Sequence, residues 1–278
     1  MEIEELRTER LDIVILAGQS NAYGYGLGSV ANEYKASPDI LMMKDIYPVD
    51  YRKNEKNEEF FDYKLPTEYF VEIAHESENS FGKIGNLSLV FADMYRKKFL
   101  CPGRKILLIE SAVGGTGFAK KQWGVDEPLC LRLDDMIKSS LSLNSCNKLV
   151  ALLWHQGEHD AYENGQMNFI EKSNFYYNRL KGVVDYLRNK YDTYDLPVIS
   201  GGFTDEWRNR NIVGCDAIYD AYHRLSEDVE DFTFIETQGL LSNNQMISNG
   251  DDIHFSRDAL YKLGKKYFEA YNELRQEH

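Results

Sequence analysis

The chain has 278 residues and a formal net charge of −13 at pH 7, with 43% hydrophobic and 28% charged residues. This composition is typical of a soluble globular protein, and the excess of acidic side chains argues against nucleic acid as a partner, because phosphate backbones are repelled. No apolar run is longer than a strand, so no segment is expected to span a membrane.

Short apolar runs alternate with longer amphipathic stretches along the chain. The run LDIVIL at 11–16 is rich in β-branched residues and predicts a strand that is buried on both faces. Similar runs follow at 105–109, 149–153, 197–200 and 232–235, and a weaker one lies at 40–43. Helical patterns occur at 87–99, 129–141, 168–190, about 216–226 and about 257–273, the last with Ser256 as its N-cap. This alternation predicts a single α/β domain over 1–278, a three-layer α/β/α sandwich with a mostly parallel sheet of five or six strands.

Residues 29–80 interrupt the alternation. They are polar and aromatic, include the charged run RKNEKNEEFFD, and have weak periodicity. We therefore expect a long loop excursion with little regular structure, which is either part of a substrate-binding wall or a solvated loop.

The cysteines and the N-terminal segment indicate the cellular compartment. The four cysteines are scattered, with no C-x-x-C pair, and the first ten residues are charged and mostly acidic. Free thiols and the lack of a signal-peptide pattern favour a cytoplasmic protein.

The segment AGQSNA, which contains Ser20, directly follows the first predicted strand. In parallel sheets, ligand chemistry lies beyond the carboxyl ends of the strands. A sharp turn from strand to helix at a small residue projects a serine hydroxyl there, which is the geometry of a nucleophile elbow. The sequence here is G-x-S-x-A rather than G-x-S-x-G, and a helix N-cap is the alternative role for Ser20.

Glycines follow the strand at 105–109, in the segment SAVGGTG. The pair Gly114 and Gly115 brings bare backbone N–H groups close to a ligand, so it predicts either an oxyanion donor or a plain turn. A phosphate loop is not predicted, because neither G-x-x-x-x-G-K-[ST] nor G-x-G-x-x-G is present, and the cluster of Gly24, Gly26 and Gly28 does not fit the second spacing.

Polar side chains follow the strand at 149–153, in the segment WHQGEHD. The amide of Gln156 is a second candidate oxyanion donor. His155, Glu158, His159 and Asp160 are a poor zinc pattern, because their spacing lacks an H-x-x-x-H helix or a cysteine ligand. No metal site is therefore predicted.

Asp251 precedes His254 by three residues, just before the last predicted helix. At this offset a carboxylate can accept the Nδ1–H of the imidazole, which leaves Nε2 free to take a proton from a serine. A helix-entry turn with acidic capping is the alternative interpretation.

Together these segments resemble the SGNH hydrolase superfamily, in particular its sialate O-acetylesterase and acetylxylan esterase branch (carbohydrate esterase family 6). The motifs GQSN, VGGT, WHQGEHD and DDIHF occur in that order, and the similarity extends into ALYKLGKKYF in the last helix. The resemblance implies a flavodoxin-like sheet and serine catalysis without a metal or other cofactor.

The resemblance also implies roles for individual residues. Ser20 is the nucleophile, His254 the general base and Asp251 its orienting carboxylate. The oxyanion hole consists of the Ser20 N–H, one glycine N–H from the pair Gly114 and Gly115, with Gly115 favoured, and the Gln156 side chain. Supporting roles fall to Asn21, Gly114 and Glu158. The branch often has D-G-x-H, and Asp252 replaces that glycine here. Both carboxylates are therefore candidates for contact with His254, and the offset favours Asp251.

The implied activity is hydrolysis of O-acetyl or other short acyl esters on carbohydrates, with acetylxylan-type oligosaccharides as the favoured substrates. A sialate O-acetylesterase and an inactive carbohydrate-binding protein of the same fold are the alternatives. The expected partner is an acetylated sugar, and the oligomeric state is left open.

Overall fold

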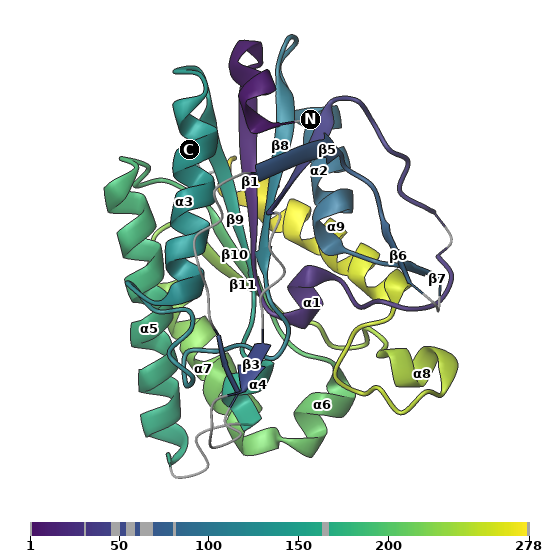
Figure 1. Cartoon of the computed structure of the whole chain (residues 1–278). Helices are drawn as coiled ribbons and strands as arrows, with labels where there is room; N and C mark the ends of the chain where they lie inside the picture. The colour runs from purple at the N-terminus through teal and green to yellow at the C-terminus, as the bar shows by residue number, and fades with distance from the viewer. Residues whose placement is uncertain are drawn as a thin grey trace.

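A seven-stranded sheet forms the centre of the structure, a computed structural model that describes residues 2–30, 32–45, 51–53, 59–61, 69–79, 82–162 and 167–276 (Figure 1). The strand order is β11-β10-β9-β1-β8-β2-β5, and all neighbours are parallel except β2 and β5. The strands are β1 (Leu11–Gly18), β2 (Ile40–Asp45), β5 (Tyr69–Ile73), β8 (Lys105–Ala112), β9 (Lys148–His155), β10 (Val198–Gly201) and β11 (Phe232–Ile235). Two small antiparallel pairs lie outside the sheet, β3 (Tyr51–Lys53) with β4 (Glu59–Phe61) and β6 (Ser77–Asn79) with β7 (Gly82–Ile84).

The strand β1 lies at the centre of the sheet, between β8 and β9, and every residue in it is buried. Ile13 and Ile15 pack into a hydrophobic cluster on one face of the sheet, and Val14 and Leu16 pack into a second cluster on the other face. A continuous apolar run is what a strand with two covered faces requires. The prediction for 11–16 is therefore confirmed.

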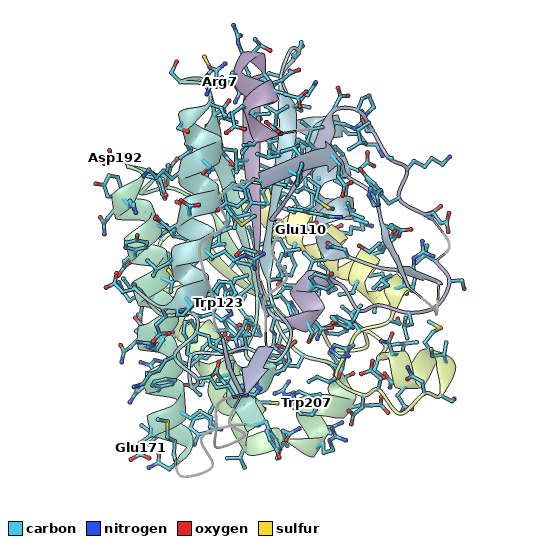
Figure 2. All side chains as sticks on the ribbon, viewed as in Figure 1. Arg7, Glu110, Trp123, Glu171, Asp192 and Trp207 are labelled. Atoms are coloured by element: carbon cyan, nitrogen blue, oxygen red, sulfur yellow. The ribbon has the colours of Figure 1, made fainter. Side chains whose placement is uncertain are left out.

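Helices cover both faces of the sheet. The first cluster includes side chains of α3 (Pro128–Ser142), α5 (Phe169–Lys190) and α7 (Ile212–Asp228), and it contains the fully buried Trp123, labelled in Figure 2. The second cluster includes side chains of α2 (Leu87–Lys98) and α9 (Arg257–Leu274). Ser256 caps α9 by accepting the N–H of Ala259, as predicted. The three-layer α/β/α fold class is confirmed.

Four short helices lie toward the carboxyl edge of the parallel strands, in the lower half of Figure 1. They are α1 (Ser20–Tyr23), α4 (Glu158–Tyr162), α6 (Asp205–Arg210) and α8 (Asn243–Ile247). A short 3-10 helix, η1 (Ile3–Thr8), precedes β1. The turns that lead into α1, α4 and α6 follow β1, β9 and β10, so they bring polar side chains to one edge of the sheet.

The region 29–80 contains more regular structure than predicted. It contributes β2 and the antiparallel edge strand β5, so the sheet has seven strands instead of five or six. The charged run at 52–62 lies mostly outside the described residues. Within the described part of the chain, no helix combines the length and the apolar character that crossing a membrane requires.

Candidate active site

The chain turns sharply between β1 and α1. Gly18 makes this turn with a φ of 142°, and a Cβ at this position would lie only 1.9 Å from the carbonyl oxygen of His155. The N–H of Gln19 donates to the same oxygen at 3.0 Å, which ties the turn to the end of β9. Ser20 therefore begins α1 at the end of the central strand, with 5% of its surface exposed. As a first helical residue, its N–H has no acceptor one turn earlier.

Asp251 and His254 contact each other in the segment that precedes α9. The Nδ1 of His254 lies 2.9 and 3.0 Å from the two carboxylate oxygens, and Asn243 donates from Nδ2 to Oδ2 at 2.8 Å. Burial raises the pKa of Asp251, but the hydrogen bonds from His254 and Asn243 outweigh it and lower the pKa below its ordinary value. An ionised Asp251 favours the His254 tautomer with hydrogen on Nδ1, which leaves Nε2 free to accept a proton.

The neighbouring carboxylate, Asp252, has a different partner. Its Oδ2 lies 2.7 Å from Nη1 of Arg210, the last residue of α6. Its carbonyl oxygen accepts a hydrogen bond from the hydroxyl of Thr204, which caps the N-terminus of α6. The structure thus pairs His254 with the carboxylate that the three-residue offset favours.

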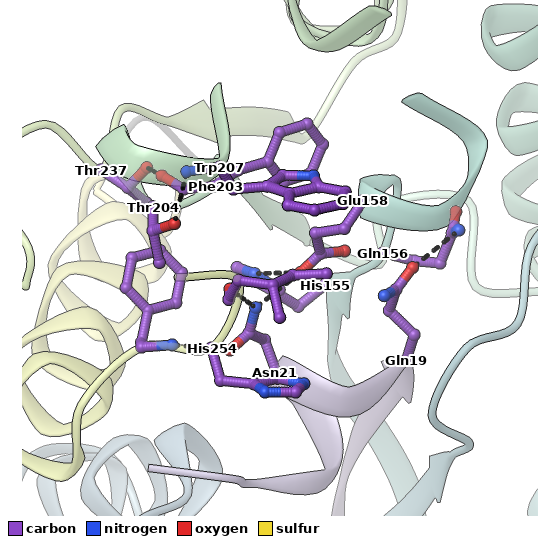
Figure 3. Close-up of polar contacts among 12 residues, drawn as sticks. Gln19, Asn21, His155, Gln156, Glu158, Phe203, Thr204, Trp207, Thr237 and His254 are labelled. Carbon is purple, nitrogen blue, oxygen red and sulfur yellow. Dashed lines mark hydrogen bonds and ion pairs between the residues drawn. The ribbon is translucent and has the colours of Figure 1, made fainter. Parts of the chain in front are cut away.

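The side chain of Asn21 joins three separate parts of the site (Figure 3). Its Nδ2 donates to Oε1 of Glu158 at 2.7 Å and to the carbonyl oxygen of Ile253 at 3.1 Å. Its Oδ1 accepts the N–H of Phe255 at 3.0 Å. Ile253 and Phe255 flank His254, so the residue after Ser20 holds the backbone on both sides of the histidine.

Other contacts bring a glycine and a tyrosine to the same place. A Cβ on Gly114 would lie 3.6 Å from the Cβ of Ser20 and 4.0 Å from the hydroxyl oxygen of Tyr25. The ring of Tyr25 stacks on His254, with ring centroids 4.9 Å apart. Gly115 follows with a φ of 68°, and a Cβ there would meet no atom within 4 Å. Gly114 therefore adjoins Ser20, and Tyr25 lies near this glycine while it stacks on His254. Gly115 is the next residue along the chain.

The amide of Gln156 is arranged differently from the prediction. Its Nε2 lies within hydrogen-bonding distance of Thr116 O (3.0 Å), Asp160 Oδ2 (2.8 Å) and Gln19 Oε1 (3.2 Å), and the side chain has no exposed surface. A primary amide has two N–H groups, so both have acceptors within the protein. Thr116 and Gln19 come from segments far away in the sequence, so the motif alone did not indicate them, whereas Asp160 lies four residues away in the same motif. Gln156 connects the residue before Ser20 to the glycine loop.

Asp160, which belongs to the same network, holds the end of the glycine-rich loop that follows β8. Its carboxylate accepts the N–H groups of Phe118 at 3.0 Å and Ala119 at 2.7 Å, in addition to the amide of Gln156. Burial raises the pKa of Asp160 to about 6, although these hydrogen bonds oppose the shift. The conformation of the loop is therefore fixed by the last residue of the WHQGEHD motif.

Glu158 and His155 form a buried pair beside Asn21. Neither side chain has exposed surface, and Oε1 of Glu158 lies 3.6 Å from Nε2 of His155. Nδ1 of His155 lies 3.0 Å from the hydroxyl of Tyr267. Burial raises the pKa of Glu158, but His155 and Asn21 outweigh it and lower the pKa. An ionised Glu158 fixes the orientation of the Asn21 amide, since only its Nδ2 can donate to a carboxylate.

Two residues of this network were not predicted from the sequence. Asn243 donates its backbone N–H to the carbonyl oxygen of His254 at 2.8 Å, and its Nδ2 donates to the carbonyl oxygen of Tyr25 at 2.9 Å as well as to Asp251. Asn243 lies in no recognisable motif, and Tyr25 is marked only by its position between two glycines. Among the described residues, no group of three or more His, Cys, Asp or Glu side chains is placed to hold a metal ion.

A buried serine at the end of the central strand lies against the first glycine of a pair. The residue after the serine holds the backbone on both sides of a histidine that is paired with an aspartate. The mostly parallel three-layer sheet that carries this arrangement is the fold that the resemblance to the SGNH hydrolases implied. The chain belongs to the family described as carbohydrate esterase, sialic acid-specific acetylesterase, because a model of that family matches residues 10–273. The resemblance indicated by the motifs is confirmed.

Solved structures share the fold at low sequence identity. The crystal structure of NanS matches with a TM-score of 0.71 and 19% identity, over 97% of this chain and 99% of that one. A protein from Arabidopsis thaliana matches with a TM-score of 0.64 and 18% identity, over 95% and 98%. A carbohydrate acetylesterase from Xanthomonas citri matches with a TM-score of 0.56 and 12% identity, over 96% of this chain and 57% of that one. A comparison with curated proteins finds no match.

Proposed function

We propose that this protein hydrolyses O-acetyl esters on carbohydrates, with Ser20 as nucleophile, His254 as general base and Asp251 as its orienting carboxylate. The observation that carries the proposal is the connection through Asn21, which attaches the backbone on both sides of His254 to the residue next to Ser20. The hydrogen bonds between His254 and Asp251 support the same assignment.

The reaction would proceed in two halves. Nε2 of His254 takes the proton of Ser20 Oγ as that oxygen attacks the ester carbonyl carbon. The tetrahedral intermediate then releases the sugar oxygen, which takes this proton from His254 and leaves as an alcohol, so that Ser20 remains acetylated. A water molecule next gives a proton to His254 and attacks the carbonyl carbon of the acetyl-serine. The second tetrahedral intermediate expels Ser20 Oγ, which takes that proton from His254, and the acetic acid leaves as acetate after losing its proton to solvent.

The proposed oxyanion hole consists of the N–H groups of Ser20 and Gly115. Gln156 takes a supporting role in this proposal, because its amide links Gln19 and Thr116, which adjoin the two segments that supply the donors. Asn21, Gly114 and Glu158 also act as supports. Preorganised donors of this kind stabilise the developing charge without reorganisation during the reaction.

O-acetylated sialic acids are the first substrates to test. The sequence favoured acetylxylan-type oligosaccharides, whereas the family to which the chain belongs is described by activity on sialic acids. We therefore place the sialate ester first and acetyl-xylooligosaccharides second. The net charge of −13 gives no preference for an anionic sugar, so the argument for sialate rests on family membership.

The direct test measures acetate release from p-nitrophenyl acetate, O-acetylated sialic acid and acetyl-xylooligosaccharides. We expect turnover by the wild type and a loss on the order of 10⁴-fold or more in Ser20→Ala, because removal of a triad nucleophile abolishes the chemical step. Ser226→Ala, a serine near the end of α7, is the matched control and should retain full activity. Binding of acetylated sugars without any hydrolysis would instead favour an inactive carbohydrate-binding protein.

A further inference from the structure

The ring of Tyr25 lies over the imidazole of His254. The ring centroids are 4.9 Å apart, and the planes differ by 19°. Stacked aromatic pairs with this spacing attract each other beyond the area that they bury. Asp251 holds the imidazole at one edge, through Nδ1. Tyr25 contacts a face of the imidazole. This contact restrains motion perpendicular to the imidazole plane, which the edge contact with Asp251 does not restrain.

The backbone of Tyr25 is fixed by its two neighbours. Gly24 has a φ of 100°, and a Cβ there would lie 2.6 Å from the carbonyl oxygen of Gly85. A Cβ on Gly26 would lie 2.8 Å from the Cα of Arg257. Gly26 also accepts the N–H of Gly85 at 2.8 Å. These glycines, which do not fit a dinucleotide-binding motif, allow the close approach that places Tyr25 above the histidine.

A shared hydrogen-bond donor connects Tyr25 to the carboxylate of the site. Nδ2 of Asn243 donates to the carbonyl oxygen of Tyr25 at 2.9 Å and to Oδ2 of Asp251 at 2.8 Å. The edge contact and the face contact on His254 are therefore held by the same amide group.

The hydroxyl of Tyr25 lies near Gly114, the glycine that adjoins Ser20. Its oxygen lies 4.0 Å from the Cβ position of Gly114, which is itself 3.6 Å from the Cβ of Ser20. The residue is 41% exposed, and within the described part of the chain no hydrogen bond to this hydroxyl is formed. Burial, and then the neighbouring Tyr23, raises the pKa of Tyr25, so the hydroxyl keeps its proton at neutral pH and can donate it.

We propose that Tyr25 is a further residue of the active site, whose ring holds the imidazole of His254 in place and whose hydroxyl donates a hydrogen bond to the bound ester. The role of the hydroxyl rests on the proposed esterase function. The role of the ring does not, because it concerns the position of His254 in the free protein.

Nuclear magnetic resonance of the imidazoles tests the ring without a substrate. The protein is labelled at the Cε1–H of its six histidines, and the signal of His254 is assigned by its loss in His254→Gln. A stacked ring shields the protons beneath its face, so Tyr25→Leu should shift the His254 signal downfield, whereas Tyr25→Phe should retain it. Tyr194→Leu, at an exposed tyrosine in another part of the chain, is the control. An unchanged His254 signal in Tyr25→Leu would overturn the proposed role of the ring.

Steady-state acetate release tests the hydroxyl. We expect Tyr25→Phe to lower kcat/KM by about three- to tenfold through a higher KM, which is the usual effect of one neutral hydrogen bond. Tyr25→Leu should in addition lower kcat by about tenfold or more, because misplacement of a catalytic group slows the chemical step. Wild-type kcat/KM in Tyr25→Phe would overturn the role of the hydroxyl. If wild type itself shows no hydrolysis, the proposed function fails, and the resonance measurement still decides the role of the ring.

Discussion

Two asparagine side chains connect segments that lie far apart in the sequence. Asn21 bonds to Ile253, 232 residues away, and Asn243 bonds to Tyr25, 218 residues away. Both use the two donors and one acceptor that a primary amide offers. Neither residue was predicted to make these contacts, because no local pattern marks a partner at such a distance. Ser20 and the pair of Asp251 and His254 were predictable, because position after a strand and a three-residue offset are local features.

The charge of Asp251 can be removed with little change in shape by Asp251→Asn. We expect kcat to fall by on the order of 10³–10⁴-fold, because the imidazole would no longer be held in the tautomer that leaves Nε2 free. The difference in stability between the wild type and this variant should also depend on pH. Hydrogen bonds from His254 and Asn243 hold the pKa of Asp251 below its ordinary value, although burial acts in the opposite direction.

A carboxylate with a lowered pKa stabilises the folded state above its unfolded value of about 3.9, and the contribution is lost as the pH falls through the folded value. The difference in free energy of unfolding between wild type and Asp251→Asn should therefore be largest above about pH 4 and shrink at lower pH. Denaturant titrations at several pH values measure it. A difference that does not change between neutral and acidic pH would contradict the assignment.

The predicted strands gained residues toward the edge that carries the site. β1 extends to Gly18, β8 to Ala112 and β9 to His155. The apolar runs located each strand, but they did not show that β1 continues as far as Gly18 or β9 as far as His155. β5 was not predicted, because it is an edge strand with only two buried positions in a polar region. The helices α6 and α8 have six and five residues, too few for a helical period to be recognised.

The turn from β1 into α1 depends on Gly18. Gly18→Ala places a Cβ 1.9 Å from the carbonyl oxygen of His155. It also requires alanine to adopt a φ of 142°, which residues with a side chain rarely adopt. We expect a loss of more than about 4 kcal/mol in the free energy of unfolding, or no folded protein, because both effects act on a buried backbone. Gly103→Ala is the matched control, since its φ is 77° but no atom lies within 4 Å of the added Cβ. It should cost about 1–2 kcal/mol from backbone conformation alone. Equal losses of stability in the two variants would contradict the prediction, because they would show that the contact between the Cβ at position 18 and the His155 carbonyl oxygen adds no cost.

At the scale of the whole molecule, a hydrophobic cluster lies on each face of one sheet. The alternation of strand and helix patterns predicted this layering, because a parallel sheet needs crossovers that cover both faces. The strand order was not predictable from these patterns, since it depends on contacts between distant segments. The assignment of 1–278 to a single domain and the cytoplasmic location stay predictions.

The two buried cysteines report on the packing of the first hydrophobic cluster, independently of activity. Cys130 and Cys215 are buried, and burial raises the pKa of each thiol to about 12. Cys101 and Cys146 are exposed. Since the thiolate is the reactive form, iodoacetamide should alkylate the two exposed cysteines of the folded protein and all four after denaturation. Mass spectrometry of the alkylated peptides measures this. Rapid labelling of Cys130 or Cys215 in the folded protein would contradict the packing of α3 or α7.

The central claim is that Ser20 and His254 act together although they are far apart in the sequence. Labelling with a fluorophosphonate probe, followed by peptide mapping, tests it most directly, because the probe reacts with a serine that a nearby base activates. We expect a single label on Ser20 in wild type, none in His254→Ala, and slower labelling in Asn21→Ala, which releases the backbone on both sides of the histidine. Labelling of Ser20 in His254→Ala at the wild-type rate, or labelling of a different serine, would contradict the account.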